Sequence, residues 1–280
     1  MIEAALLEDR AVLALCGVEA RDFLQGLITN DVTQCKDSCG IYTALLTPQG
    51  KILFDFFVIP EGDNRLLIDC AADRAGDLMK RLTLYRLRAK VDIAARPELA
   101  VAALWGDVLP GDVPHGVITI ADPRRDALGL RMIGARDVLV RAMAGFARGD
   151  HRARRLSLGV PDSADLPSDS VFALDAGLEE LNGVSFKKGC YIGQEVTSRM
   201  KHRATARRRF LMAETIGAIP PPGTPLEAQG RELGVLATGE ADRALALVRL
   251  DRLADAEEKH APITAAGQPV ILKKPDWFHV

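Results

Sequence analysis

The first sixty residues alternate between two spacings of apolar side chains. Residues 10–17 (R-A-V-L-A-L-C-G) form a short apolar run that ends at a glycine, which predicts a buried strand. Residues 20–28 (A-R-D-F-L-Q-G-L-I) place apolar side chains three and four positions apart, which predicts a helix. Residues 41–60 carry two apolar runs on either side of T-P-Q-G and predict a hairpin with its turn at 47–50.

The same mixture continues to about residue 160. Further strands are predicted at 64–70, 89–93, 99–105 and 129–133. Helices are predicted at 74–82 and in the basic segment 147–161, which a loop at 161–170 follows. Strands interleaved with helices indicate an α+β architecture.

The pattern of apolar runs along the chain changes near Arg207. From there, short apolar runs are separated by Gly and Pro, as in P-P-P-G-T-P-L and G-R-E-L-G-V-L-A-T-G. This spacing predicts a small all-β barrel or sandwich. We therefore expect two domains: an interwoven α+β region with two subdomains at 1–204, and a C-terminal β-barrel at 205–280.

Composition narrows the class of protein without identifying it. The 280 residues carry a net charge of -2, so whole-chain charge indicates neither nucleic acid nor a membrane as partner. No apolar run approaches the roughly 20 residues that span a bilayer. The five cysteines are an odd number, which argues against a secreted disulfide framework. The first residues show no secretory signal, so we expect a cytoplasmic protein, while a matrix-type compartment after removal of a transit peptide fits the same features.

Residues 187–195 read K-K-G-C-Y-I-G-Q-E and form the most unusual stretch of the chain. Gly189 and Gly193 permit backbone conformations or close approaches that a β-carbon would block. Lys188 and a helix start near Gly193 would both favour the thiolate form of Cys190, as a redox group, a metal or cluster ligand, or a nucleophile. The alternative is that Cys190 is a small buried hydrophobic residue and the glycines are turn residues.

Positive charge is concentrated between Lys187 and Arg209. Eight Lys and Arg residues stand there against one acid, Glu195, which gives +7 in a chain of net -2. This density favours an anionic partner, either the polycarboxylate tail of a small ligand or a phosphate backbone, over a merely solvated face. The stretch contains one aromatic residue, Tyr191, and Phe210 directly follows it, which weakens the case for a single-stranded nucleic acid.

Other common site motifs are missing from the sequence. There is no G-x-G-x-x-G, no G-x4-G-K-[ST] and no G-x-S-x-G, which argues against dinucleotide-binding, nucleotide-hydrolase and serine-hydrolase sites. Cys35 and Cys39 have no second cysteine pair, and the five histidines show no ligand spacing. We therefore predict no metal site.

The motif at 188–195, K-G-C-Y-I-G-Q-E, resembles the signature of the folate-binding YgfZ proteins and their mitochondrial iron–sulfur assembly relatives. Further segments resemble the same family in the same order: F-L-Q-G-L-I-T-N-D-V (23–32), L-L-T-P-Q-G-K-I-L-F-D-F-F (45–57), Y-R-L-R-A-K-V (85–91) and L-D-A-G-L-E-E-L-N-G-V-S-F (174–186). This family is similar to the aminomethyltransferase of the glycine cleavage system. The resemblance implies an α+β, aminomethyltransferase-like folate-binding fold with a small C-terminal β-barrel, and tetrahydrofolate as the cofactor.

The resemblance also implies where the folate would be held. Carboxylate or amide groups would bind the pterin and cations would bind the glutamyl tail, and Gln194, Glu195 and the run from Arg203 to Arg209 supply both kinds of group. The expected cofactor-binding residues are Asn30, Lys188, Gly189, Tyr191, Gly193, Gln194, Glu195, Arg203 and Arg208. Cys190 is expected to be the reactive thiol.

One segment departs from the related aminomethyltransferases. Those enzymes carry a G-G-x-x-D-D-type segment whose aspartate assists one-carbon transfer, whereas this chain has G-K-I-L-F-D at 50–55. Asp55 remains as a candidate catalytic group, but the aspartate pair is gone. This change argues against aminomethyl transfer and leaves open whether the chain is an enzyme.

Three functions remain open from the sequence. The first is a tetrahydrofolate-binding accessory factor for iron–sulfur cluster assembly or repair, with Cys190 reactive, indirect effects on tRNA modification, and iron–sulfur proteins or their assembly machinery as partners. The second is a folate-dependent aminomethyltransferase that uses Asp55. The third is an RNA-binding module that uses the basic stretch, although we do not expect nucleic acid as a direct partner.

Overall fold

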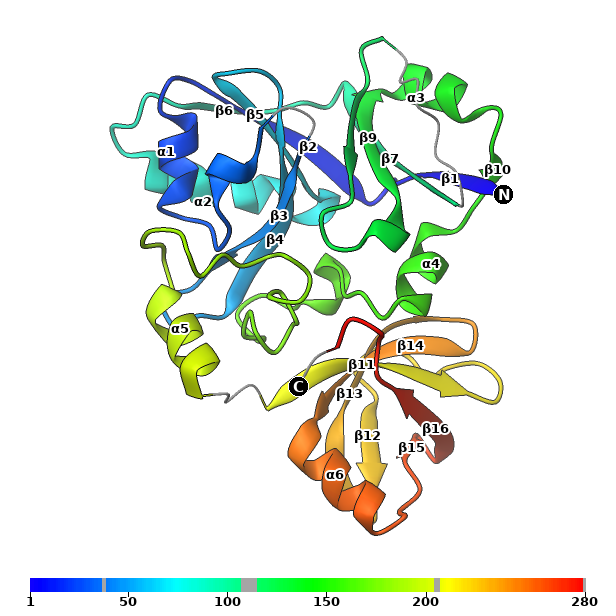
Figure 1. Ribbon diagram of the computed structural model, residues 1–280. Coiled ribbons are helices and arrows are strands. Elements are labelled where there is room, and N and C mark those ends of the chain that lie inside the picture. The colour runs from blue at the N-terminus through cyan, green and yellow to red at the C-terminus, as the bar shows by residue number, and fades with distance from the viewer. Residues whose placement is uncertain (37–38, 107–114, 204–206, 279–280) are drawn as a thin grey trace.

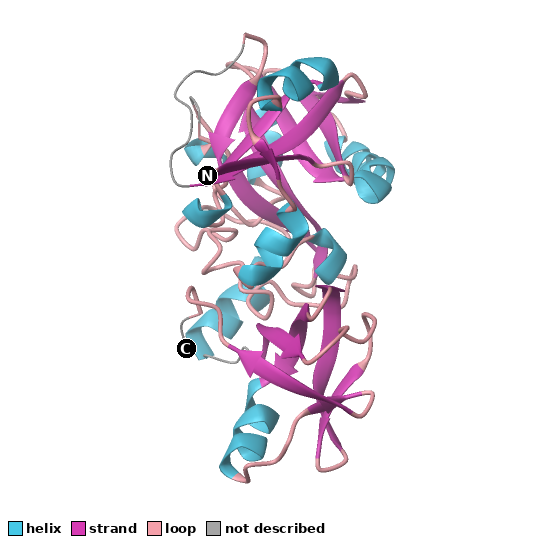
Figure 2. Cartoon of the chain, turned by 90° about the vertical axis from the view of Figure 1, so that its right-hand side faces the viewer, coloured by secondary structure: helices cyan, strands magenta, loops and turns pink. Residues whose placement is uncertain are grey.

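Two five-stranded sheets and a closed barrel form the framework of the protein (Figure 1). The structure, a computed structural model, describes residues 1–36, 39–106, 115–203 and 207–278. The two sheets form the upper part of the molecule, and the barrel lies below them (Figures 1 and 2).

The first sheet is antiparallel and has the order β3-β4-β5-β2-β6. Its strands are β2 (Arg10–Cys16), β3 (Ile41–Leu46), β4 (Ile52–Pro60), β5 (Arg65–Ala71) and β6 (Asp92–Ala95). Two helices pack on its outer face: α1 (Ala20–Gln25) and α2 (Ala75–Arg86). The strand alternation explains this packing, because Leu13 and Leu15 of β2 face the helices while Val12 and Ala14 face the second sheet.

The second sheet has the order β10-β1-β7-β9-β8. Its strands are β1 (Ile2–Leu6), β7 (Leu99–Gly106), β8 (Ile118–Ala121), β9 (Leu130–Ala135) and β10 (Ala147–Arg148). On its outer face, Ala102 and Leu104 of β7 pack with Leu139 of α3 (Arg136–Met143). On its inner face, Val101 and Ala103 join the core between the two sheets. The result is a layered sandwich of helices, sheet, sheet and helix.

The barrel closes in the order β11-β14-β13-β12-β15-β16. Its strands are β11 (Arg208–Thr215), β12 (Pro225–Ala228), β13 (Arg231–Glu240), β14 (Arg243–Arg249), β15 (Thr264–Ala265) and β16 (Gln268–Lys273). Leu253 and Ala256 of α6 (Leu250–Glu258) pack into the barrel's own core. Before the barrel come α4 (His151–Ser157) and α5 (Gln194–Arg203).

The predicted α+β architecture and the C-terminal barrel are confirmed. The strand at 10–17, the helix at 20–28 and the hairpin at 41–60 correspond to β2, α1 and the β3–β4 pair. The elements that were not predicted from the sequence include β1, β8, β10, β15, α3 and α6. The expected domain boundary between residues 204 and 205 lies outside the described residues.

Candidate functional site

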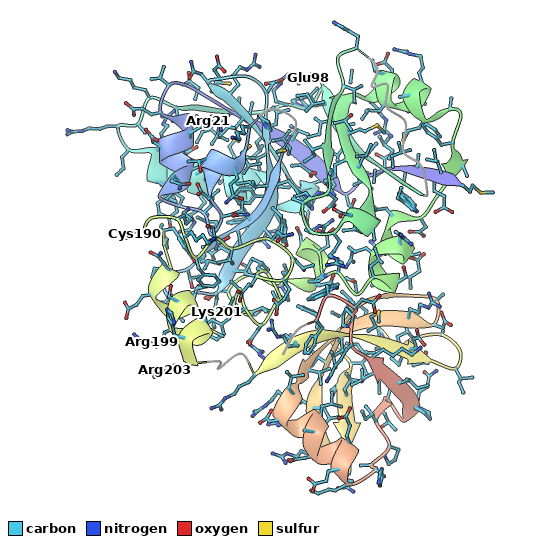
Figure 3. The ribbon with its side chains drawn as sticks, in the orientation of Figure 1. Arg21, Glu98, Cys190, Arg199, Lys201 and Arg203 are labelled. Atoms are coloured by element: carbon cyan, nitrogen blue, oxygen red, sulfur yellow. The ribbon has the colours of Figure 1, made fainter. Side chains whose placement is uncertain are left out.

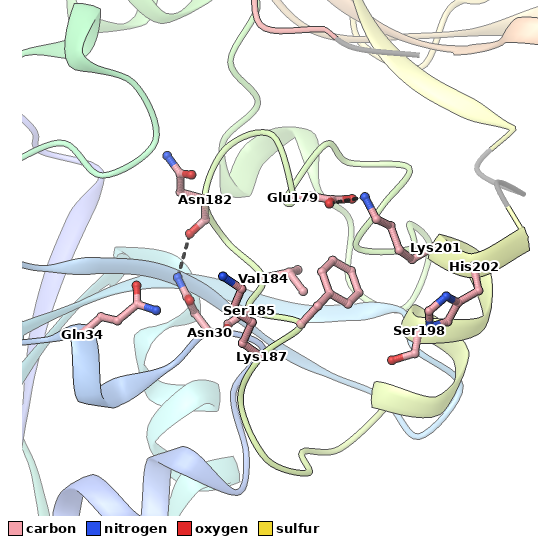
Figure 4. A pocket seen from close by; sticks show the side chains of 11 residues that line it. Asn30, Gln34, Glu179, Asn182, Val184, Ser185, Lys187, Ser198, Lys201 and His202 are labelled. Carbon is pink, nitrogen blue, oxygen red and sulfur yellow. Dashed lines mark hydrogen bonds and ion pairs between the residues drawn. The ribbon is translucent and has the colours of Figure 1, made fainter.

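A cavity of about 760 Å³ opens beside α5. Its lining is Asn30, Gln34, Glu179, Asn182, Val184, Ser185, Phe186, Lys187, Ser198, Lys201 and His202. These residues come from the segment after α1, from the irregular segment 179–187 and from one face of α5 (Figure 4). The lining combines amides, hydroxyls, a carboxylate, two lysines and an aromatic ring, a mixture typical of a site for a polar organic ligand.

The wall of the cavity is built by pairing two chain segments far apart in sequence. The Thr29 hydroxyl donates to the Gly183 carbonyl at 2.6 Å, and the Ser185 amide donates to the Thr29 carbonyl at 3.0 Å. The Asn30 side-chain amide donates to the carbonyls of Tyr42 at 2.8 Å and Asn182 at 2.7 Å. Both amide protons of Asn30 are therefore used inside the protein, so this side chain positions the cavity wall.

Lys188 binds the motif to residues 25–30, the chain segment that includes Asn30. Its buried ammonium donates to the carbonyls of Gln25 at 2.7 Å, Ile28 at 2.6 Å and Asn30 at 3.0 Å. These three bonds use all the donors of the ammonium group. Burial lowers the pKa of Lys188 to about 8, and the Asp31 carboxylate offsets part of that shift. The structure thus gives Lys188 a positioning role behind the cavity wall.

Gly193 lets the motif lie directly against the turn of the β3–β4 hairpin. Its φ is +83°, and a β-carbon there would lie 2.6 Å from the Thr47 carbonyl oxygen. Across the same contact, Gly50 has φ +82° and a β-carbon would lie 3.0 Å from Cβ of Val196. Gly189 differs, because its φ is outside the left-handed region and a β-carbon there would have no neighbouring atom within 4 Å. The close approach made by Gly193 is therefore to the protein's own turn.

Cys190 is exposed on the loop that leads into α5 (Figure 3). Because the residue is exposed, the interpretation of Cys190 as a buried hydrophobic residue is wrong. Its thiol forms no disulfide. Tyr191, the next residue, turns inward and is buried, with the Lys188 ammonium 5.0 Å from the centre of its ring. Burial raises the pKa of Tyr191 to about 12. The buried Lys188 and Tyr191 therefore hold the motif in place, and the Cys190 thiol between them along the chain is exposed to solvent.

The two faces of α5 have different surroundings. Ser198, Lys201 and His202 lie at i, i+3 and i+4 and face the cavity. Glu195 and Arg199 form an ion pair one turn apart on the exposed face, which Arg203 continues (Figure 3). Gln194 begins the helix, and its backbone amide donates to the Tyr191 carbonyl at 3.2 Å. Neither Gln194, Glu195 nor Arg203 lines the cavity.

Much of the positive charge between 187 and 209 has partners inside the protein. Lys201 pairs with Glu179 beside the cavity (Figure 4). At the start of the barrel, Arg208 pairs with Asp175 at 3.4 Å and Arg209 pairs with Glu180 at 2.7 Å. The acids come from the segment 174–186, which stood out in the sequence only as a family-like segment. Three of the eight cations therefore pair with this segment and join it to α5 and to the start of the barrel.

Asp55 lies apart from the cavity, in a buried ionic layer between the two sheets. The Tyr42 hydroxyl donates to its carboxylate at 3.0 Å. Burial raises the pKa of Asp55, the Asp162 carboxylate adds to the rise, and Arg10 offsets part of it. The described interior here holds four arginines and five aspartates: Arg10, Arg124, Arg131, Arg155, Asp55, Asp69, Asp122, Asp162 and Asp165. The other four aspartates each pair with an arginine, whereas Asp55 accepts a hydrogen bond from a tyrosine.

Of the residues expected to bind a cofactor, the structure places Asn30 in the cavity wall. Lys188 and Gly193 hold that wall and the start of α5, and Arg208 joins the segment 170–175 to the barrel. The predicted site did not include the inner face of α5 or the residues Glu179, Asn182, Ser185 and Phe186. Two signals were available: the family-like segment 174–186, and the i, i+3, i+4 spacing of Ser198, Lys201 and His202.

Within the described ranges, no group of three or more His, Cys, Asp or Glu side chains is arranged to hold a metal ion. The helices described are all too short or too polar to cross a membrane.

The comparisons with known proteins agree across sequence and fold. The family described as "CAF17, C-terminal beta-barrel domain" matches residues 207–280. The crystal structure of glycine cleavage system aminomethyltransferase T from Bartonella henselae superposes with a TM-score of 0.74 over 99% of this chain and 86% of that one. The two share 17% sequence identity, so this likeness concerns the fold. The aminomethyltransferase-like fold is therefore confirmed.

Sequence relatives extend the match to the whole chain. The mouse and human proteins named iron-sulfur cluster assembly factor IBA57, mitochondrial, are each 30% identical, over 97% of this chain and 84% of their own length. A Neurospora crassa homologue is 31% identical over 73% of this chain and 52% of its own length.

These relatives correct one expectation. All three are named as mitochondrial proteins, so the cytoplasmic assignment is wrong. Free cysteines indicate a reducing compartment, and this signal does not separate the cytoplasm from the mitochondrial matrix. The identity and the coverage of the mouse and human proteins settle the family: the chain belongs to the IBA57 family of iron–sulfur cluster assembly factors.

Proposed function

We propose that this protein is a tetrahydrofolate-binding accessory factor for the assembly or repair of iron–sulfur clusters, with Cys190 as its reactive thiol. The observation that carries the proposal is the cavity beside α5, which lies next to the motif in a chain of the IBA57 family. Effects on tRNA modification would follow indirectly, through cluster-dependent enzymes.

The residues of the cavity fit a reduced folate in chemistry and size. A volume of about 760 Å³ is within the range of sites for ligands of this size. The amides of Gln34 and Asn182 and the carboxylate of Glu179 suit the donors and acceptors of a pterin. Lys187 suits a carboxylate of the glutamyl tail, and Lys201 would exchange its Glu179 partner for a second one. Bound there, the folate would supply one-carbon or redox chemistry that these side chains lack.

Cys190 is suited to act at a site shared with a partner. Its thiol is exposed, whereas burial raises the pKa of Cys35 and of Cys70 to about 12 and keeps both thiols protonated. One cysteine does not complete the four ligands of an iron–sulfur cluster. In this proposal the cluster, a sulfur species or an oxidised intermediate is cargo, and the remaining ligands come from a client or an assembly protein.

The test of this thiol compares two exposed cysteines. Cys190→Ser and Cys39→Ser would each replace the wild-type gene in cells, followed by activity assays of cluster-dependent enzymes. We expect loss of these activities with Cys190→Ser and normal activities with Cys39→Ser, because both thiols are exposed and only the first belongs to the motif. Normal cluster-enzyme activities in the Cys190→Ser cells would contradict the proposal.

The two other functions have less support. Aminomethyl transfer would use Asp55, which is 5% exposed, bonded to Tyr42 and outside the cavity lining. That function would be established if the protein formed methylene-tetrahydrofolate and Asp55→Asn abolished this activity.

RNA binding would use the cations of the basic stretch. Four of these cations already have partners inside the protein: Lys188, Lys201, Arg208 and Arg209. An RNA affinity that does not fall with salt would exclude it.

A further inference from the structure

A second surface, at the end of α2, is exposed, apolar and basic at once. Val18 is 69% exposed, Leu84 70% and Leu87 87%. Leu84 lies in the last turn of α2 and Leu87 directly follows the helix, so both are exposed at the same helix end. Together with Arg81, Arg88 and Lys90 these residues form what we call the α2 end surface.

Tight backbone contacts bring Val18 beside this helix end. The Glu19 carboxylate accepts a hydrogen bond from the Lys90 amide at 2.9 Å. A β-carbon on Gly17, whose φ is +141°, would lie 2.1 Å from the Lys90 carbonyl oxygen. The loop after β2 and the chain after α2 are therefore fixed against each other, so the three apolar side chains belong to one surface.

Leu87 is not explained by the needs of the fold. It follows the last residue of α2 with φ 46° and ψ -105°, a conformation in which an L-residue is strained and glycine is favoured. Its side chain is almost wholly in solvent and contributes little to the core. A strained leucine that points into solvent is useful when something outside the chain covers it.

The end of α2 carries charge of one sign, with the Glu19 carboxylate beside it at the Lys90 amide. Residues 80–90 (K-R-L-T-L-Y-R-L-R-A-K) contain five cations and no acid. Lys80 pairs with Asp77, and Arg86 donates to the Val91 carbonyl at 3.3 Å. Among the described residues, the side chains of Arg81, Arg88 and Lys90 have no ion-pair partner. Like Lys187, and unlike Lys201, Arg208 and Arg209, these three are available to an external anion.

We propose that the α2 end surface docks an acidic segment of a protein partner, with an aliphatic side chain against Val18, Leu84 and Leu87 and carboxylates on the three cations. Arginines favour planar carboxylates, which they bind through two parallel hydrogen bonds. A single-stranded nucleic acid would need exposed aromatic rings for stacking, and the one ring here, Tyr85, packs into the core of the first sheet. A membrane would need a broader apolar face, but Leu78 and Leu82 of α2 are buried in the protein.

The test is a selection of displayed random peptides on the full-length protein, with depletion on a double variant, Leu87→Gly with Arg88→Glu. We expect a consensus that combines Asp or Glu with an aliphatic residue. The consensus peptide, synthesised and titrated, should bind Leu87→Gly and Arg88→Glu at least about tenfold more weakly than wild type. Ile216→Gly, which removes an aliphatic side chain that is 92% exposed on the barrel, should leave its affinity unchanged.

Leu87→Gly also separates docking from folding. Glycine relieves the strain, so this variant should unfold at a higher temperature than wild type while it loses the peptide. The proposal is overturned by a failure to enrich any peptide, by a consensus without carboxylates, or by equal affinities of wild type and Leu87→Gly. Binding of phosphatidylglycerol vesicles or of single-stranded RNA that depends on Leu87 would also overturn it and assign the surface to that other class of partner.

Discussion

At the scale of single residues, the motif separates into positions that hold the structure and one that faces outward. Gly193 and Lys188 are fixed by the protein's own backbone, at the hairpin turn and at the carbonyls of 25–30. Cys190 is exposed between them along the chain. The sequence alone indicated that these residues belong together, but it assigned Lys188 to a ligand because a buried ammonium has no signature in one sequence.

The two glycines of the motif should respond differently to alanine. Gly193→Ala adds a β-carbon against the Thr47 carbonyl at positive φ, so we expect a loss of about 2–4 kcal/mol in the free energy of unfolding. Gly189→Ala meets no atom, so we expect a change within about 1 kcal/mol. Chemical denaturation of both variants measures this. Equal stabilities would show that the motif does not rest on the hairpin turn.

Lys188 should be needed for stability, unlike its neighbour. Lys188→Met leaves three carbonyls without their donor, and we expect it to cost about 2–4 kcal/mol. Lys187→Met, at an exposed position, should stay within about 0.5 kcal/mol of wild type. Urea unfolding of the two variants compares them directly, and a Lys188→Met protein as stable as Lys187→Met would refute the positioning role.

The ionisation of Lys188 gives an independent check. Burial sets its pKa to about 8, so an NMR titration of the lysine side chains should show one ammonium that titrates well before the others. The unfolded chain then binds more protons than the folded one from about pH 8 to the ordinary lysine pKa. This group's contribution to the free energy of unfolding therefore rises with pH across that window. A single titration step at the ordinary lysine pKa would contradict this environment.

At the scale of elements, the inner faces of the two sheets enclose charge as well as apolar side chains. Arg131 of β9 donates to Asp69 of β5 at 2.9 Å, and Arg10 of β2 donates to the same carboxylate at 2.7 Å. Phe57 of β4 lies among these groups, with the Arg131 guanidinium 3.9 Å from its ring centre. Asp69 and Asp55 are both buried, but they have different neighbours, and this difference is testable.

Replacement by asparagine should lower the free energy of unfolding at Asp69 but not at Asp55. Asp69→Asn removes the charge that two buried arginines share, so we expect a loss of about 3–5 kcal/mol. Asp55→Asn keeps the acceptor for Tyr42 and removes a charge that burial disfavours, so we expect no loss at pH 7.

The pH dependence of unfolding tests the same assignment. Since the folded pKa of Asp55 is raised, the folded wild type binds more protons above the ordinary aspartate pKa, and this group's contribution to stability falls as the pH rises toward neutrality. Asp55→Asn should lack this decline. Thermal unfolding of both proteins between about pH 4 and 7 measures it, and parallel curves would contradict the assignment.

Periodicity predicted the elements that have a clear apolar pattern, and it failed for specific reasons elsewhere. The β3–β4 hairpin was evident because both runs are apolar and T-P-Q-G is a turn sequence. β8 is only Ile118–Ala121, too short to show a clear apolar pattern, and β1 follows directly on the first residue. The cavity was not predicted because Asn182, Ser185 and Phe186 lie in a segment without helix or strand, whose position depends on hydrogen bonds to residues 29 and 30.

At the scale of the whole molecule, buried polar bonds join the barrel to the sheets. The Asp165 carboxylate accepts from Arg155 at 2.6 Å and from the backbone amide of Thr238 on β13 at 2.8 Å. The Thr238 hydroxyl accepts from Arg155 at 3.0 Å. These bonds, with the Arg208 and Arg209 pairs, link the barrel to the region that contains the cavity.

Asp165→Ala should loosen this junction. It removes the carboxylate that Arg155 binds at 2.6 Å and leaves the buried guanidinium with the more distant Asp162 at 3.9 Å, so we expect a loss of about 3–5 kcal/mol and faster hydrogen exchange in β13. Thr238→Val, which removes one hydroxyl, should cost about 1 kcal/mol. Hydrogen exchange followed by mass spectrometry measures both effects. Unchanged exchange in β13 of Asp165→Ala would show that the barrel does not depend on this junction.

Binding of tetrahydrofolate in the cavity beside α5 is the proposal on which the rest of the function depends. It is tested by anaerobic calorimetric titration of tetrahydrofolate into wild type, Ser198→Trp and Arg199→Trp. Ser198 lines the cavity and Arg199, the next residue of the helix, is exposed outside the lining, so the two variants add the same ring inside and outside the cavity. We expect saturable binding to wild type and Arg199→Trp and its loss in Ser198→Trp. No binding to wild type at about millimolar ligand, or equal binding to all three proteins, would contradict the proposal.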